Sequence, residues 1–136
     1  MDNLAQAQEW QRLAAMDLKG AEHLLNMHPV PIEIICYLCQ QSAEKYLKGL
    51  LVLHGTNPPK THDLDELCKL CCLQVSGAIS DVADQCSDLT AYGVQPRYPT
   101  GSMLEEQDMQ LALRSARTVR NLVLSLAPEM AVDTQE

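Results

Sequence analysis

Two short clusters contain residue types suited to binding or acid–base chemistry. His62 and Asp63 are adjacent, and an imidazole beside a carboxylate can exchange protons near neutral pH. Arg97 and Tyr98 are adjacent as well. A guanidinium can bind phosphate in a bidentate manner, and a neighbouring tyrosine can stack on a base or donate its hydroxyl. These four residues are the first candidates for a ligand site.

Each cluster also has a purely structural interpretation. Asp63 can cap a helix that begins at Leu64, while His62 fixes the preceding turn through hydrogen bonds. Arg97 can pair with an acidic helix end, such as Asp63 or Glu66, and so close its own loop. The sequence leaves the binding and the structural interpretations open.

Two further cations, Lys45 and Lys48, lie three residues apart in a helical stretch and are neighbours on its surface. Glu44 precedes Lys48 by four residues, which suits a stabilising ion pair on a solvated face. The alternative is that both lysines face a phosphate beside Arg97. We therefore keep Lys45 and Lys48 among the candidate ligand-binding residues.

Three arginines, at positions 114, 117 and 120, recur at steps of three near the C-terminus. Acidic residues at 105, 106 and 108 are their expected partners on the same helix. A surface for a phosphate or an acidic partner is the alternative. The chain has no Gly-rich phosphate loop, Ser-His-Asp pattern or HExxH motif, so the sequence assigns no catalytic residue.

Six cysteines stand at positions 36, 39, 68, 71, 72 and 86. The spacing of the 36–39 and 68–71 pairs is superficially that of a zinc site. However, these four cysteines fall on the apolar stripes of expected helices, where a cysteine packs as a small hydrophobic residue. We therefore expect buried free thiols, with no metal site and no cofactor.

The chain has 136 residues and a formal net charge of −8 at pH 7. A general nucleic-acid binder usually carries a basic surface, so any phosphate contact must come from a local cluster of cations. No apolar run approaches the roughly 18 residues that span a membrane, and the N-terminus lacks the apolar core of a secretory signal. We therefore expect a cytoplasmic protein without membrane contact.

Apolar residues recur every three or four positions in most of the chain, which is the period of a packed helix. The expected helices span residues 3–26, 31–54, 63–74, 78–92 and 103–126. Capping boxes are expected at Asp63 with Glu66 and at Ser102 with Glu105. Because the connections are short, we predict an all-α, up-and-down bundle of four long helices plus one short helix. It forms one domain over residues 1–127, followed by a disordered tail at 128–136.

Several motifs occur in a fixed order along this bundle. Residues 40–50 read QQSAEKYLKGL, residues 61–64 read THDL, and residues 97–99 read RYP before the last long helix. In these features the chain resembles the HEPN domain family in its small stand-alone prokaryotic form. The resemblance extends over about residues 5–126.

The resemblance implies a homodimer that associates with a nucleotide, with RNA, or with a minimal nucleotidyltransferase in a toxin–antitoxin-like module. Many HEPN relatives are metal-independent ribonucleases marked by an Arg followed four to six residues later by a His. Here residues 98–104 read YPTGSML, with no His after Arg97. The leading hypothesis is therefore a non-catalytic protein that binds a nucleotide or a nucleotidyltransferase around residues 93–101 and the His62 turn.

Two alternatives remain open. The first is a metal-independent ribonuclease in which His62 reaches Arg97 across the bundle and supplies the acid–base group. The second is a structural adaptor whose exposed helix faces bind a protein partner. The absent Arg–His motif favours a protein that is not an enzyme.

Overall fold

The computed structural model describes residues 2–93 and 104–132, and all regular secondary structure within these ranges is helical. Its α-helices are α1 (Asn3–His23), α2 (Ile32–Leu53), α3 (Leu64–Gln74), α4 (Ala83–Thr90) and α5 (Glu106–Leu126). Short 3-10 helices are η1 (Leu24–Asn26), η2 (Gly77–Val82), η3 (Ala91–Gly93) and η4 (Pro128–Met130). The all-α fold class is confirmed.

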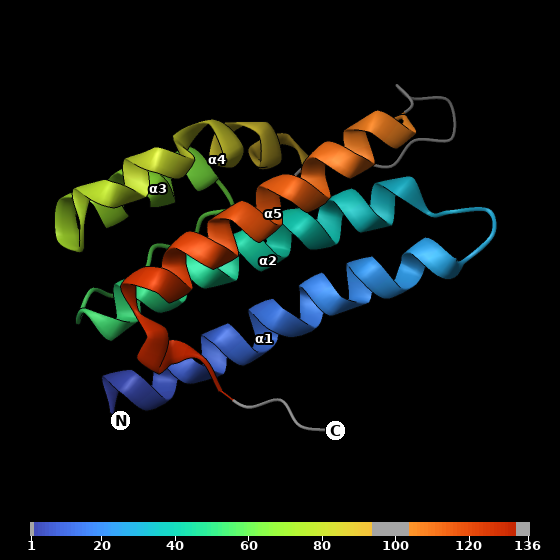
Figure 1. Ribbon diagram of the computed structural model, residues 1–136. Helices are drawn as coiled ribbons and strands as arrows, with labels where there is room; N and C mark the ends of the chain where they lie inside the picture. Colours follow the sequence, from blue (N-terminus) through green and yellow to red (C-terminus); the bar gives the residue numbers. More distant parts are fainter. Residues whose placement is uncertain (1, 94–103, 133–136) are drawn as a thin grey trace.

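The three longest helices lie side by side, and α2 packs against both α1 and α5 (Figure 1). α1 runs opposite to α2, while α5 runs in the same direction as α2 (Figure 1). The shorter α3 and α4 pack on α2 and α5, on the side away from α1 (Figure 1). Across the described residues, no helix is both long enough and apolar enough to span a membrane. α2 is thus the central helix, and its polar residues can contact several other elements.

The ends of α2 are set by local backbone chemistry. Pro31 is its N-cap, where the missing N–H of proline has no helical partner to lose. At the other end, Gly55 adopts a φ of 82°, a left-handed conformation that glycine tolerates best. The backbone N–H of Thr56 then donates to the carbonyl of Leu51 at 2.9 Å. The chain leaves α2 in a fixed direction, toward the turn that carries His62.

The helix predicted at 78–92 is not continuous, so that prediction is corrected. It divides into η2, the eight-residue α4 and η3. Ile79 and Val82 of η2 are both buried, and residues three apart share a face when a helix has three residues per turn. The 3-10 conformation therefore directs both side chains into the core before α4 begins.

α5 also begins later than residue 103. Glu105 is its N-cap, and a reciprocal capping box joins Glu105 to Asp108. The predicted partner Ser102 lies outside the described residues. Glu105 is therefore the first member of the capping box and not its fourth residue.

Residues 128–132 pack on the bundle, although the sequence predicts that they belong to a disordered tail. Met130 of η4 is fully buried. The side chain of Gln8 donates to the carbonyl of Glu129 at 3.0 Å, and the N–H of Val132 donates to Gln11 Oε1 at 3.1 Å. These contacts hold the stretch after α5 against α1.

Candidate functional site

A buried carboxylate on α2 is the centre of a polar cluster. The side chain of Glu44 is only 6% exposed. Its Oε2 atom accepts a hydrogen bond from Lys48 Nζ at 2.9 Å. Its Oε1 atom lies 3.0 Å from His62 Nδ1 and accepts from Gln40 Nε2 at 3.2 Å. Both carboxylate oxygens are therefore engaged.

Helix periodicity and one tight turn bring this cluster together. Gln40, Glu44 and Lys48 are four residues apart and share one face of α2. The turn after α2 returns His62 to that face, where the Gln40 amide donates to the His62 carbonyl at 3.0 Å. His62 is thus held at two points, through its backbone carbonyl and through its ring.

The cluster keeps Glu44 ionised. Burial opposes the charged form, but the hydrogen bonds that Glu44 accepts from His62 and Lys48, and the charge of Lys48, outweigh it. The pKa of the Glu44 carboxyl consequently lies below its ordinary value. An ionised carboxylate can only accept hydrogen bonds, so each group that bonds to Glu44 must be a donor.

Lys48 does not lie on a solvated face, contrary to one of the two interpretations of the sequence. It is buried, pairs with Glu44 as the four-residue spacing predicts, and its Nζ lies 5.9 Å from the centre of the Trp10 ring. Lys45 forms an ion pair with Asp17 of α1 at 2.6 Å. Both predicted ligand-binding lysines are therefore engaged by carboxylates within the chain.

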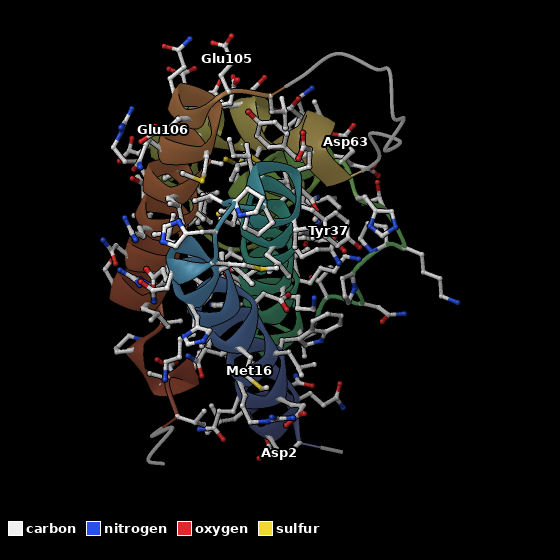
Figure 2. The ribbon with its side chains drawn as sticks, turned by 90° about the vertical axis from the view of Figure 1, so that its right-hand side faces the viewer. Asp2, Met16, Tyr37, Asp63, Glu105 and Glu106 are labelled. Carbon is white, nitrogen blue, oxygen red and sulfur yellow. The ribbon has the colours of Figure 1, made fainter. Side chains whose placement is uncertain are left out.

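Asp63 is the N-cap of α3. Its Oδ1 accepts from the N–H groups of Asp65 at 2.9 Å and Glu66 at 3.3 Å. The predicted reciprocal bond from Glu66 is not formed, because the N–H of Asp63 donates to Thr61 Oγ1 at 3.1 Å. Asp63 lies on the surface, at the upper right of Figure 2.

The ring of His62 is the most accessible part of the cluster. Its side chain is 57% exposed, although Nδ1 is engaged by the buried Glu44. Nε2 is consequently the ring nitrogen left for a ligand. A fixed yet accessible imidazole is well suited to hydrogen bonding or proton exchange.

Arg97 and Tyr98, the other predicted site residues, lie outside the described part of the chain. The helix before them is nevertheless tied to the start of α3, because the N–H of Leu64 donates to Thr90 Oγ1 at 3.1 Å. Thr90 ends α4, and η3 follows it directly. The end of α4 therefore lies beside the first residue of α3, two positions after His62.

The arginine stripe of α5 is partly neutralised from another helix. Arg117 donates through Nε to Glu22 of α1 at 2.9 Å, and not to the acidic residues at 105, 106 and 108 that the sequence suggests. Arg120 donates to Asn121 at 3.0 Å. The hollow at the start of α5 is lined by Glu105, Glu106, Gln107 and Gln110, so its charge does not suit a phosphate.

The cysteines of the 36–39 and 68–71 pairs are buried, as the apolar stripes predict. All six cysteines are free, five are buried, and Cys72 is half-buried. Burial raises the pKa of Cys39 and Cys71 to about 12. Within residues 2–93 and 104–132, no group of three or more His, Cys, Asp or Glu side chains is arranged to hold a metal ion.

Sequence reasoning missed the link between Glu44 and His62, and it missed Gln40 as a site residue. A usable signal was present, because three polar residues recur at four-residue spacing in a helix whose other positions are mostly apolar. Such residues must bond to one another or to a neighbouring element when they are buried. The Gln40 Oε1 atom is buried and has no partner among the described residues.

Comparison with known proteins agrees with this architecture. A search of curated proteins gave no match. The crystal structure of TT1696 from Thermus thermophilus is similar, with a TM-score of 0.76 and 23% sequence identity, over 93% of this chain and 99% of that chain. This similarity shows a shared fold. The family model of the HEPN domain matches residues 7–126, so the chain belongs to the HEPN domain family.

Proposed function

We propose that this HEPN protein is a non-catalytic nucleotide-binding protein whose site is the surface around the His62 turn and residues 93–101. The observation that supports this most is the accessible His62 ring, anchored to the buried Glu44 carboxylate. In support of this location, the bond between Leu64 and Thr90 holds the end of α4 beside the first residue of α3, two positions after His62. A ligand bound there would meet His62 and the Arg97-Tyr98 pair together.

The division of roles follows from which groups are already engaged. The Lys48 ammonium is buried against Glu44, so it holds the carboxylate in place and does not contact the ligand. Asp63 is occupied in capping α3. Arg97 remains for the phosphate and Tyr98 for stacking or for shaping the pocket. With a net charge of −8, a small ligand with few phosphates is favoured over an extended nucleic acid.

Family membership further suggests a homodimer and a minimal nucleotidyltransferase partner in a toxin–antitoxin-like module. This part of the proposal rests on the family and on no contact within the chain. Affinity capture of the tagged protein, followed by mass spectrometry, tests it. Stoichiometric recovery of a nucleotidyltransferase supports the two-component module, and recovery of a dimer alone contradicts it.

The nucleotide proposal is tested by calorimetric titration with mono-, di- and triphosphates of adenosine and guanosine. We expect saturable binding that Arg97→Ala and His62→Gln each weaken by about tenfold, the size of one charge-assisted hydrogen bond. His28→Gln and Arg114→Ala are matched controls, since both residues are exposed and lie outside the His62 cluster. Equal loss in the controls, or no binding by the wild-type protein, contradicts the proposal.

One observation favours a second candidate, a metal-independent ribonuclease. A carboxylate that orients an exposed imidazole is the arrangement used for general acid–base catalysis, and Glu44 and His62 have this geometry. If the purified protein cleaves RNA in the presence of a chelator, and both His62→Gln and Arg97→Ala abolish cleavage, the protein is an enzyme. If preparations free of contaminating nuclease do not cleave RNA, the ribonuclease candidate is contradicted.

A further inference from the structure

The carboxylate of Glu44 constrains the chemistry of the His62 ring. Because Glu44 is ionised and already accepts from Gln40 and Lys48, it has no proton to offer His62. The contact of 3.0 Å between His62 Nδ1 and Glu44 Oε1 is therefore a hydrogen bond only if Nδ1 carries a proton. When the ring is neutral, its second nitrogen must then be unprotonated.

The same contact decides which nitrogen faces outward. Nδ1 is turned toward the buried carboxylate, whereas the ring as a whole is 57% exposed. The backbone of His62 is held by the amide of Gln40. Turning Nε2 inward would therefore break the bond between Nδ1 and Glu44. Nε2 is thus presented to a ligand as a hydrogen-bond acceptor.

We propose that Glu44 is a positioning residue that fixes the Nδ1–H tautomer of His62, so that Nε2 accepts a hydrogen bond from a ribose hydroxyl of the nucleotide. The ribose contact rests on the proposed function, since a nucleotide must bind near His62. A nucleotide can donate from its sugar hydroxyls and from base N–H groups, whereas its ionised phosphate cannot; the proposal assigns the sugar hydroxyl to Nε2, and the deoxy analogues test it against the base. The site would therefore favour ribonucleotides over their deoxy counterparts.

The tautomer is measured first, on the free protein, by long-range proton–nitrogen NMR at a pH where the ring is neutral. We expect the Nδ1–H form for His62 in the wild-type protein. In Glu44→Gln/Lys48→Met, the amide can donate or accept, and the double change leaves no buried charge unpaired. The His62 signals should then shift toward the Nε2–H form.

The control variant is Asp17→Asn/Lys45→Met, which makes closely similar chemical changes at the ion pair between α1 and α2. It should leave the His62 tautomer unchanged. An Nε2–H tautomer in the wild-type protein overturns the inference without any variant, even if the double variant does not fold. A tautomer that is the same in wild-type and Glu44→Gln/Lys48→Met also overturns it.

The ribose contact is then tested by titration with a ribonucleotide and its 2′-deoxy, 3′-deoxy and 2′,3′-dideoxy analogues at the same pH. Loss of the hydroxyl that bonds to Nε2 should weaken binding about three- to tenfold, the effect of one hydrogen bond. That preference should disappear in His62→Ala, which removes the acceptor and leaves the pair of Glu44 with Lys48 intact. Equal affinity for all four overturns the ribose contact, and absence of any binding overturns the proposed function while the tautomer measurement still decides the role of Glu44.

Discussion

His62 Nδ1 lies 3.0 Å from Glu44 Oε1, although the two residues are 18 positions apart in the chain. The bond joins an exposed turn to the buried face of the central helix, so that the accessible ring is anchored to the core. The same carboxylate is bound by the buried Lys48. Glu44 therefore contributes both to the stability of the fold and to the orientation of the proposed ligand-binding residue His62.

The first prediction concerns the buried ion pair. Glu44→Gln leaves Lys48 in a largely buried position without a counter-charge, and we expect a loss of about 3–5 kcal/mol in the free energy of unfolding. Glu44→Gln/Lys48→Met removes both charges and should cost much less than the single change. Urea denaturation of the wild-type protein and of both variants measures these values. A double variant that is as unstable as the single one would contradict the assignment.

The second prediction concerns acid. The pKa of Glu44 in the folded protein is lower than its ordinary value of 4.5, so the unfolded chain binds this proton more readily. The stabilisation is fully present above a pH of about 4.5 and is lost as the pH falls through the folded-state pKa. Unfolding measured between pH 6 and pH 3 should show this loss. The dependence should be weaker in Glu44→Gln/Lys48→Met, and an unchanged profile would argue against a charged Glu44.

The third prediction concerns close packing at Gly49. A Cβ at this position would lie 2.8 Å from Met130 Cε and 3.0 Å from Trp10 Cβ. Gly49→Ala should therefore destabilise the protein by about 1–3 kcal/mol through overpacking. Gly20→Ala is the matched control, since its Cβ would meet only Leu38 at 3.7 Å, and it should be neutral or stabilising by up to about 1 kcal/mol.

Thermal and urea unfolding of the two glycine variants give this comparison. A double-mutant cycle with Met130→Ala tests whether the clash involves the stretch after α5. If residues 128–132 pack on the bundle, the effects of Gly49→Ala and Met130→Ala on the free energy of unfolding should not be additive. Strictly additive effects would mean that Met130 does not contact Gly49.

The fourth prediction concerns thiol reactivity. Burial raises the pKa of Cys36, Cys39 and Cys71 to about 12, so at pH 8 these thiols are protonated as well as inaccessible. We expect one fast-reacting thiol with a thiol-specific reagent in the native protein, namely the half-buried Cys72. All six should react after unfolding in guanidinium. Two or more fast thiols in the native protein, or a fast thiol that survives Cys72→Ser, would contradict this packing.

Several features can be predicted without the structure because they depend on residues within one or two helical turns. The apolar period places α1, α2 and α5, the glycine at 55 ends α2, and Asp63 caps α3. The ion pair of Glu44 with Lys48 follows from four-residue spacing, and the burial of the thiols at 36, 39, 68 and 71 follows from their positions on apolar stripes. Such local relationships need no knowledge of how the helices pack.

Other features emerge only when the helices are packed, because they depend on which helix faces which. Lys48 lies beside Trp10 only because α1 packs on α2. Arg117 bonds to Glu22, which is 95 positions away in the chain. The bond from His62 to Glu44 requires the turn after α2 to fold back onto it. Local sequence thus specifies the helices and the residue types of the site, whereas the packing of α1 and α3 on α2 builds that site on a buried carboxylate.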